Sequence, residues 1–414
     1  MISMKKRAAY RALCLTWALA VLLPAAGGHA MAASKDTRKY SLPLKGTTVL
    51  QNTPDRGIRP VTEVVRHEKI AGESPTTGLP WEGDYLPMLV QIGTNVDSVK
   101  VKGSTVKSMG IGKSAPWGGQ FADIVYEGIL SGYSFTRFSF LFNDSFEKGE
   151  PQKGVGPVRS TRIGPLLLRE EWQSGYVYGG GFAGTFGWED HQTLALLRQS
   201  GAESQGVLFD LRRSDLAGLA YRVEGVKAPS NLNADIIAIR SLIPASHTPL
   251  PRPFLFADEN PYTGGYAAAQ TVHLDWGAKE SVSHFRYDEN SRLYLRFCGP
   301  GMNETKWTPS MTFSAVDDRS AENQRQLCFA NLIIQRVNYE YILNNWLVPD
   351  MRSIGRGNAD IFTGGRYVPG YWVRGDIADP TVFYDDRGQE IKLARGKTFI
   401  AHFPPESLCT FTAE

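Results

Sequence analysis

Residues 122–127 read ADIVYE, and residues 135–142, a short distance further on, read FTRFSFLF. β-branched and aromatic residues dominate both stretches, and this composition predicts two neighbouring strands. Further runs of the same kind are predicted strands at 86–92, 176–178, 271–274, 282–287, 293–297, 332–341 and 398–403. The chain is therefore expected to be rich in β-structure.

Two segments in the first half of the chain have the features of helices. Residues 164–172 carry Pro165 near their first turn, where proline is well tolerated. Residues 190–199 place leucines on one face and stop before Gly201. We therefore expect an α+β fold, with a mixed α/β N-terminal domain followed by a mostly-β C-terminal domain.

The clearest boundary is the segment 243–253, whose four prolines favour an extended spacer. The expected organisation follows from this boundary and from the composition on either side of it. It comprises a signal peptide at 1–32, an extended tether at 33–75, an N-terminal domain with the ligand site at 76–242, the proline-rich linker at 243–253 and a C-terminal domain at 254–414.

The N-terminus has the three parts of a secretory signal peptide. A basic segment at 5–11 precedes an apolar run at 12–23, and a cleavage site with small residues follows at 30–32. The apolar run is shorter than the roughly 18–20 residues of a bilayer-spanning helix, although an uncleaved anchor is the alternative. Cys14 lies inside this run and not at the cleavage point, so we expect no lipid anchor. The mature chain is expected outside the cytoplasm, either secreted or in the periplasm or cell wall.

Composition and motif spacing exclude several classes of protein. The formal net charge is +3, but four basic residues and no acid fall in the first 33 positions, so the remainder is nearly neutral. A nucleic-acid partner is therefore not expected. The sequence contains no zinc-binding spacing, no G-x-S-x-G elbow and no complete phosphate loop, so we expect no metal and no cofactor. Cys298, Cys328 and Cys409 can form at most one disulfide.

Glu127 is the candidate catalytic residue in the segment 122–127. On one strand, the Cα atoms of Asp123 and Glu127 would be about 13 Å apart, which is awkward for a pair of glycosidase carboxylates. Glu127 alone could serve as a general acid if its surroundings raised its pKa. The structural alternative is a cross-strand ion pair between Glu127 and Arg137.

The loop at 155–165 is the candidate for binding, because it presents Arg159, Ser160 and Arg162 directly before a predicted helix. The free N–H groups and the positive dipole end of a helix N-terminus favour an anion. Two guanidinium groups with planar donor forks add to that preference. The anion could belong to a carboxylate or phosphate ligand, or it could be one of the two carboxylates discussed above.

Other residues could complete such a site. Arg137 would support the two loop arginines, and Tyr126 and Tyr178 would offer rings on which a sugar can stack. Residues 179–184 match G-x-G-x-x-G, but no helix opens directly after them, so a dinucleotide site is not favoured. Gly180 is instead expected to let the backbone approach a ligand closely.

The order of these motifs resembles the YerB-like family, a two-domain family of bacterial envelope lipoproteins whose activity is undefined. The resemblance covers about 78–402, and the motif at 227–232 makes Lys227 and Asn231 further candidates for ligand binding. Ser230 stands where the family usually has histidine, and the lipoprotein cysteine is missing. The matching segments are 122–127, 136–138, 154–162, 227–232, 330–335, 381–385, 388–393 and 396–400.

The function that we expect is recognition of an anionic ligand of the cell envelope, with peptidoglycan as the leading candidate. One alternative is a glycan-cleaving enzyme with Glu127 as its general acid. The other is a scaffold that binds envelope proteins through the β-rich C-terminal domain. The expected partner is accordingly a cell-wall glycan or an envelope protein.

Overall fold

The computed structural model describes residues 46–50, 55–58, 60, 66–132, 135–181, 201–202, 204–278, 280–341 and 349–413. All of them belong to one unit that extends from Pro43 to Glu414. The predicted signal peptide at 1–32 and the predicted helix at 190–199 lie outside the described residues. No helix in the described ranges has the length and apolar character needed to cross a membrane.

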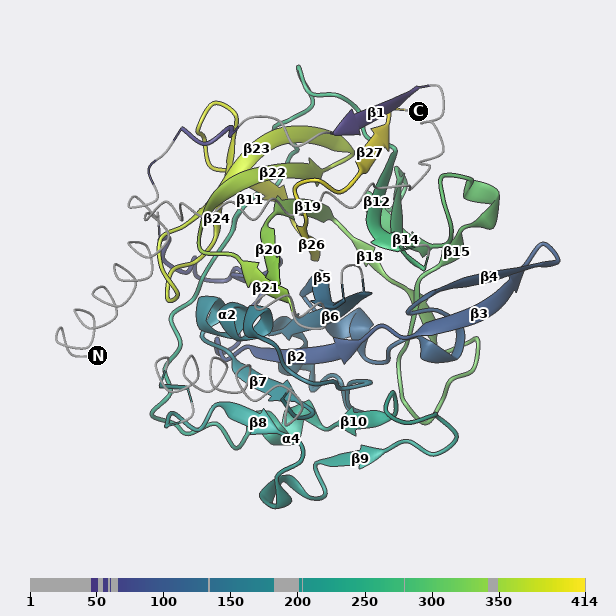
Figure 1. Ribbon diagram of the computed structural model, residues 1–414. Coiled ribbons are helices and arrows are strands. Elements are labelled where there is room, and N and C mark those ends of the chain that lie inside the picture. The colour runs from purple at the N-terminus through teal and green to yellow at the C-terminus, as the bar shows by residue number, and fades with distance from the viewer. Residues whose placement is uncertain are drawn as a thin grey trace, which may run out of the picture. The chain divides into compact units, whose positions relative to one another are not determined.

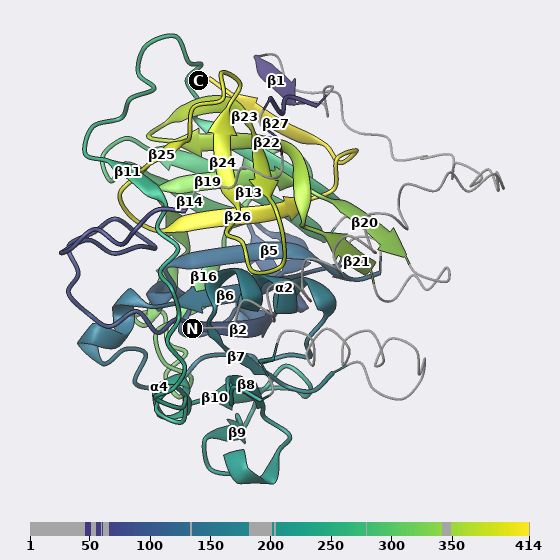
Figure 2. The same cartoon turned by 90° about the vertical axis from the view of Figure 1, so that its left-hand side faces the viewer.

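A ten-stranded sheet runs through this unit (Figure 1, Figure 2). Five of its strands precede the proline-rich segment at 243–253 and five follow it. The two groups meet where β26 pairs in parallel with β5, with Ile400 opposite Tyr126. In order across the sheet, the strands are β24 (Val382–Asp385), β23 (Arg366–Arg374), β22 (Gly355–Thr363), β19 (Asn331–Arg336), β26 (Thr398–Phe403), β5 (Ile124–Ser131), β6 (Phe135–Phe142), β2 (Met88–Gly93), β7 (Gly175–Tyr178) and β8 (Leu208–Asp210).

A seven-stranded sheet packs against one face of the ten-stranded sheet. Phe285 contacts Phe399 with ring centroids 4.9 Å apart, and Trp276 lies edge-on to Phe403 at 4.8 Å. Each such buried ring contributes about 2–3 kcal/mol of transfer free energy, so these contacts hold the two sheets together. The strands are β1 (Thr47–Leu50), β27 (Cys409–Thr412), β12 (Thr271–Ala278), β13 (Ser281–Asp288), β14 (Leu293–Cys298) and β15 (Thr308–Pro309), with β18 (Cys328–Phe329) paired to β14.

Helix α2 (Ile163–Trp172) lies on the opposite face of the ten-stranded sheet, as its predicted range 164–172 anticipated (Figure 1). The indole Nε1 of Trp172 donates a 2.7 Å hydrogen bond to the hydroxyl of Tyr126 on β5. Helix α4 (Ile236–Arg240) is a single short turn that Asp235 caps by accepting from the Ala238 amide.

The predicted α+β class is wrong, because the described residues form mostly β-structure and contain two short α-helices, α2 and α4. The helical features at 164–172 indicate one helix against a sheet and not a layer of helices. The strands before the proline-rich segment continue into the same sheet as those after it. The described part of the chain therefore contains no mixed α/β N-terminal domain.

Shorter two-stranded ribbons accompany the two large sheets. The ribbon of β3 and β4 projects from the side of the unit (Figure 1). These ribbons are β3 (Val96–Val101) with β4 (Ser104–Met109), β9 (Ala220–Arg222) with β10 (Leu232–Ala234), β11 (Leu255–Ala257) with β25 (Lys392–Ala394), β16 (Met311–Phe313) with β17 (Gln324–Gln326), and β20 (Asn338–Tyr341) with β21 (Pro349–Arg352).

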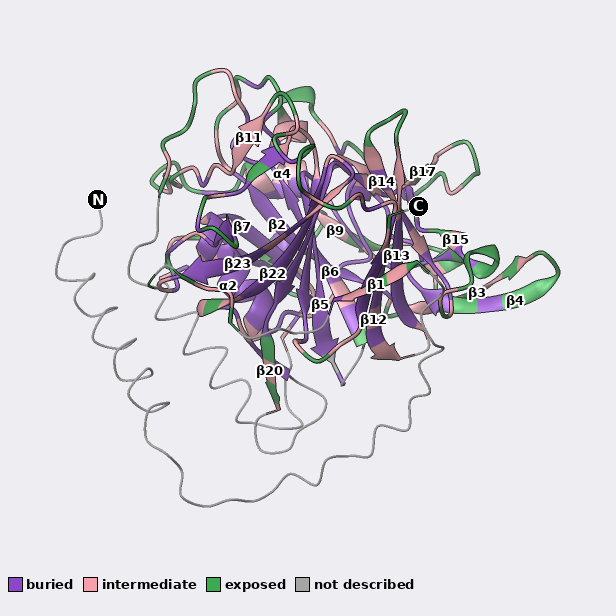
Figure 3. Cartoon of the chain, turned by 90° about the horizontal axis from the view of Figure 1, so that it is seen from above, coloured by how far each residue is buried: buried purple, intermediate pink, exposed green. Residues whose placement is uncertain are grey.

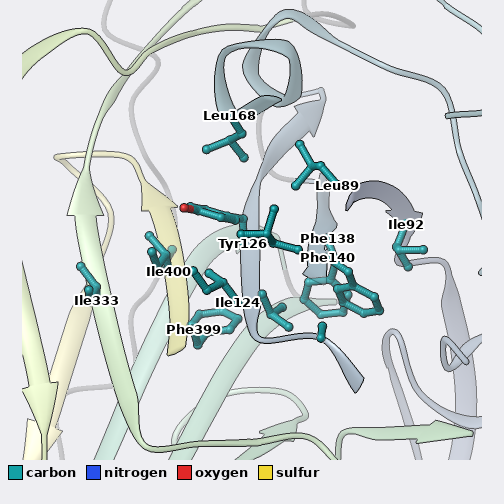
Figure 4. Close-up of a cluster of buried hydrophobic side chains, with 14 of the residues drawn as sticks. Leu89, Ile92, Ile124, Tyr126, Phe138, Phe140, Leu168, Ile333, Phe399 and Ile400 are labelled. Carbon is teal, nitrogen blue, oxygen red and sulfur yellow. The ribbon is translucent and has the colours of Figure 1, made fainter. Parts of the chain in front are cut away.

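One hydrophobic core extends across strands from both sides of the proline-rich segment. Figure 3 shows that the buried residues gather along the strands of the sheets. In Figure 4, Ile124, Tyr126 and Phe138 lie in one cluster with Phe399 and Ile400. Both faces of β5 and β6 are covered, which explains why their sequences read as nearly continuous apolar runs. Residues 122–127 and 135–142 therefore form the centre of the core.

The three cysteines of the described chain are free thiols. Cys298 and Cys409 are buried, and Cys328 is half-buried. Burial raises the pKa of the Cys409 thiol to about 12, which keeps it protonated and unreactive. These side chains behave as small apolar residues of the core.

Candidate functional site

Three arginines gather where the loop before α2 lies beside the first residues of β6, and we call them the arginine cluster. They are Arg137 on β6, Arg159 in the loop and Arg162 at the N-cap of α2. Arg137 lies opposite Gly128 in the β5–β6 register, so its side chain points away from the seven-stranded sheet. Its Nη1 donates to the backbone carbonyl of Ser160 at 3.0 Å. The sheet and the loop thus present their guanidinium groups to one place.

The loop is held by backbone hydrogen bonds to neighbouring segments. The Arg159 amide donates to the Gln91 carbonyl on β2, and the Gly179 amide donates to the Arg159 carbonyl, each at 2.9 Å. Gly93 on β2 lies against the Arg159 side chain, and a Cβ at this position would come within 2.6 Å of Arg159 Cγ. The position of Arg159 is therefore set by the hydrogen-bonded backbone of the loop and by the space that Gly93 leaves for its side chain.

Two of the three arginines, Arg137 and Arg159, lie in an electrostatically unfavourable environment. Burial lowers the pKa of Arg137 well below its usual range, and the charges of Arg162 and Arg159 lower it further. Burial also lowers the pKa of Arg159. Within the described residues, no carboxylate forms an ion pair with Arg137 or Arg159. The first turn of α2 contains no acidic residue. An anion placed here would relieve the repulsion between the arginines.

Hydroxyl and amide groups surround the arginine cluster. The hydroxyl of Ser230 accepts from Arg159 Nη1 at 3.4 Å and also from the side-chain amide of Asn95. Ser160 lies between two of the arginines, and its hydroxyl donates to the Gly179 carbonyl at 3.4 Å. Ser230 therefore lies directly beside the cluster.

A tyrosine pair and a glycine turn border the same place. Tyr176 and Tyr178 alternate along β7 and stack with ring centroids 5.0 Å apart. Gly180 has a φ of +87°, and its amide donates to the carboxylate of Asp210 at 3.0 Å. A side chain at Gly180 would be strained at this φ and would come within 2.8 Å of Arg212 Nε. The turn therefore requires glycine for conformational reasons as well as for space.

Glu127 lies on the other face of the sheet, away from the arginine cluster. Its Oε2 accepts from Arg296 on β14 at 3.0 Å and from Ser283 at 3.1 Å, and its Oε1 accepts from Thr136 at 2.7 Å. Arg137 points to the opposite face, so the cross-strand pair with Glu127 is not formed. Glu127 is 2% exposed, and this environment favours a structural ion pair over contact with a substrate.

Asp123 lies in a separate buried polar group at the start of β5. Its carboxylate accepts from the hydroxyl of Thr76 at 3.1 Å and from the amide of Asp144 at 3.0 Å. Burial, and then the negative charge of Asp144, raise the pKa of Asp123 to about 8, whereas the nearby Lys397 acts in the opposite direction. Neither carboxylate considered as an internal partner, Glu127 or Asp123, therefore reaches the arginine cluster.

The remaining candidates are also placed away from the cluster or have other partners. Tyr126 is buried beneath α2, where its ring stacks on His402 at 5.3 Å. Asn231 accepts from Arg222 at 2.9 Å and donates to the Val223 carbonyl, so it ties the β9–β10 ribbon together. The side chain of Lys227 is exposed.

Sequence patterns did not identify Asn95 and Tyr176 as site residues. Tyr176 and Tyr178 are two positions apart on one strand, so both rings lie on one face. This spacing could have identified Tyr176 as a neighbour of the predicted site residue Tyr178. Asn95 lies three positions after the end of the predicted strand at 86–92, and nothing in the local sequence distinguishes it. Its position at the site depends on how distant segments come together.

The fold and the site define a class of mostly-β proteins in which two sequence segments share one sheet beside a cluster of arginines. The chain belongs to the DUF3048 family. Residues 112–248 match the model described as "Protein of unknown function (DUF3048) N-terminal domain", and residues 272–400 match the corresponding C-terminal domain. The family expected from the sequence, the YerB-like two-domain family, is thereby confirmed.

A solved structure supports the same assignment at the level of the fold. The crystal structure of the YerB protein from Bacillus subtilis is similar to this chain with a TM-score of 0.57 and 20% sequence identity. The match covers 81% of this chain and 97% of the YerB chain. No curated protein matches this sequence. Neither comparison assigns an activity, so the function has to be argued from the site.

Proposed function

We propose that this chain is an exported cell-envelope protein that binds an anionic ligand at the arginine cluster. The observation that carries the proposal is Arg137, a half-buried cation beside two other arginines that has no carboxylate partner in the described part of the chain. Buried charges in proteins are normally paired, and an unpaired one costs several kcal/mol. A bound carboxylate or phosphate would supply the missing charge.

The neighbouring groups suit a ligand that is partly sugar. Tyr178, which is 8% exposed and is stacked on the fully buried Tyr176, offers an aromatic edge, and the Ser230 hydroxyl offers a further polar contact beside Arg159. Aromatic faces next to a few fixed polar groups are typical of carbohydrate sites. Peptidoglycan combines sugar rings with free carboxylates, and it is the ligand that we propose first.

The proposed location outside the cytoplasm rests on the sequence. The basic segment at 5–11, the apolar run at 12–23 and the small residues at 30–32 form a secretory signal. Export would bring the mature chain into contact with the cell wall.

The test is sedimentation of the purified mature chain with cell-wall sacculi freed of phosphate polymers. We expect the wild type to sediment, and we expect Arg159→Gln to remain mostly in the supernatant. Arg325→Gln is the matched control, because Arg325 is an exposed arginine on β17, far from the cluster in sequence and contacts. Equal sedimentation of the two variants would contradict the proposal.

The same samples discriminate the enzyme alternative. Mass spectrometry of the supernatant would detect glycan fragments that a cleaving enzyme releases. The proposal predicts no fragments from the wild type. Fragments that disappear with a folded Glu127→Gln variant would instead support glycan cleavage. Binding only to sacculi that retain phosphate polymers would identify the anion as phosphate.

A further inference from the structure

Phe135, the first residue of β6, has an exposed aromatic side chain beside the arginine cluster. It is 43% exposed, whereas the other phenylalanines of the described chain are buried or half-buried. Tyr178 is only 8% exposed, and Tyr176 is fully buried. Among the described aromatic residues of β6 and β7, the ring that solvent reaches is therefore that of Phe135.

The alternation of side chains along β6 places Phe135 and Arg137 on the same face of the sheet. Thr136 lies between them and points to the seven-stranded sheet, where its hydroxyl donates to Glu127 at 2.7 Å. Arg137 points to the opposite face, where its Nη1 donates to the Ser160 carbonyl at 3.0 Å. Two positions along an antiparallel strand span about 7 Å, so the ring and the guanidinium group extend from neighbouring points of one face.

The end of β2 explains why Phe135 is exposed. β2 pairs with β6 as far as Gly93, which lies opposite Arg137. Beyond this point the chain leaves the sheet, and the hydroxyl of Thr94 donates to the Thr136 carbonyl. β6 therefore extends two residues further than β2, and none of the described residues of β2 pairs with Phe135.

The apolar surface that Phe135 leaves accessible is large enough to affect binding. An enclosed aromatic side chain buries roughly 150–250 Å², so an exposed fraction of 43% corresponds to roughly 60–110 Å². Covering apolar surface of this size raises affinity by about tenfold or more. A ligand held at the arginine cluster gains this contribution if it also covers the ring.

We propose that a sugar ring of the ligand stacks on Phe135 while a carboxylate of the same sugar unit binds to Arg137 and Arg159. This role of Phe135 rests on the proposed function, and it narrows the ligand to a sugar acid. The separation of about 7 Å between the two positions on β6 matches a carboxylate carried on the sugar or on a short substituent of it. It does not match a carboxylate several peptide units away from the sugar.

The test compares three small probes by NMR titration of the mature chain. N-acetylmuramic acid has both a sugar ring and a carboxylate, lactate has a carboxylate without a sugar ring, and N-acetylglucosamine has the ring without a carboxylate. We expect N-acetylmuramic acid to bind at least about tenfold more tightly than either of the other two. We also expect intermolecular NOEs between the ring of Phe135 and the sugar protons in the wild type.

Variants at position 135 separate the ring from the anion site. Phe135→Ala should weaken the binding of N-acetylmuramic acid by about tenfold and leave lactate binding unchanged. Phe135→Tyr retains an aromatic ring and should retain the affinity. Leu250→Ala is the matched control, because Leu250 is 53% exposed and its amide donates to Gln173 at the C-cap of α2, whereas the cluster is at the N-cap.

Arg159→Gln distinguishes a failure of this role from a failure of the proposed function. It should weaken the binding of lactate and of N-acetylmuramic acid alike. Unchanged binding of both probes to Arg159→Gln would overturn the anion site and, with it, the role of Phe135. If Arg159 is required, the role of Phe135 alone is overturned by any of three results: equal affinity for N-acetylmuramic acid and lactate, undiminished binding of N-acetylmuramic acid to Phe135→Ala, or a wild-type complex without NOEs to the Phe135 ring. The NOE result decides the question if Phe135→Ala fails to fold.

Discussion

The carboxylate of Glu127 lies 3.0 Å from the guanidinium of Arg296, and both side chains are 3% exposed. Glu127 lies on β5 and Arg296 on β14, so the ion pair joins the ten-stranded sheet to the seven-stranded sheet. Arg296 also lies over the ring of Phe138 at 4.9 Å, and its Nη1 donates to Ser310 at 2.5 Å. The pair is therefore a buried polar link between the two sheets, and neighbouring hydroxyl groups complete its hydrogen bonds.

Removing one partner of this ion pair should lower the free energy of unfolding. Glu127→Gln leaves the buried Arg296 without its counter-charge, and we expect a loss of about 3–5 kcal/mol in the free energy of unfolding. Urea unfolding measures this value. Glu127→Leu combined with Arg296→Met removes both charges and should be clearly more stable than Glu127→Gln alone. A single variant as stable as the wild type would show that the pair is not a structural link.

Asp123 should give the protein a pH-dependent stability. Its pKa is raised from 3.8 to about 8 in the folded chain, first by burial and then by Asp144. Between about pH 4 and pH 8 the folded state therefore holds more protons than the unfolded state, so stability falls as the pH rises, by up to roughly 1.4 kcal/mol per pH unit. Asp123→Asn should lose this slope.

Urea midpoints at about pH 5 and pH 7 test this prediction, because both pH values lie between the ordinary pKa of an aspartate and the raised pKa of Asp123 in the folded chain. The difference between Asp123→Asn and the wild type should shift in favour of the variant at the higher pH. Parallel pH profiles for the two proteins would contradict the assignment of the proton to Asp123.

A substitution at Gly93 should displace the Arg159 side chain without changing Arg159 itself. A Cβ at position 93 would come within 2.6 Å of Arg159 Cγ, so Gly93→Ala should displace the guanidinium and weaken anion binding. Gly181→Ala is the matched control, since a Cβ at that position meets nothing within 4 Å. Titration with phosphate, followed by the change in melting temperature, measures the effect. Equal shifts in both variants would mean that Arg159 does not contact the anion.

Phosphate itself should stabilise the wild type more than chloride at matched ionic strength. A ligand present at about ten times its Kd adds about 1.4 kcal/mol to the free energy of unfolding. Arg137→Met should lose this stabilisation, yet in chloride it should be no less stable than the wild type because it relieves repulsion from Arg159 and Arg162. A variant that is strongly destabilised in chloride would show that Arg137 holds the fold together and does not serve a ligand.

Local features of the sequence predicted individual elements well. The bounds of β6 and β26 agree with the predicted runs at 135–142 and 398–403, and α2 agrees with the predicted helix at 164–172. These segments are buried on one or both faces, so their composition reflects their environment directly. The predicted strand at 332–341 is interrupted at Val337, where β19 ends and β20 begins.

Local sequence patterns could not predict which distant strands pair with each other. The parallel pairing of β5 with β26 joins distant segments, and it makes the predicted mixed α/β domain wrong. Arg296, the partner of Glu127, is 169 positions away and could not be identified from spacing. The arginines at 159 and 162 lie close in sequence, so their convergence was predictable, whereas the approach of Asn95 was not.

Binding of an anionic wall fragment at the arginine cluster can be measured directly by calorimetry. A soluble disaccharide–peptide fragment of peptidoglycan with free carboxylates is titrated into the mature wild type, Arg159→Gln and Arg325→Gln. We expect saturable binding to the wild type and to Arg325→Gln, and at least about tenfold weaker binding to Arg159→Gln. Equal affinity of all three proteins, or equally tight binding of the fragment with its carboxylates amidated, would contradict this expectation.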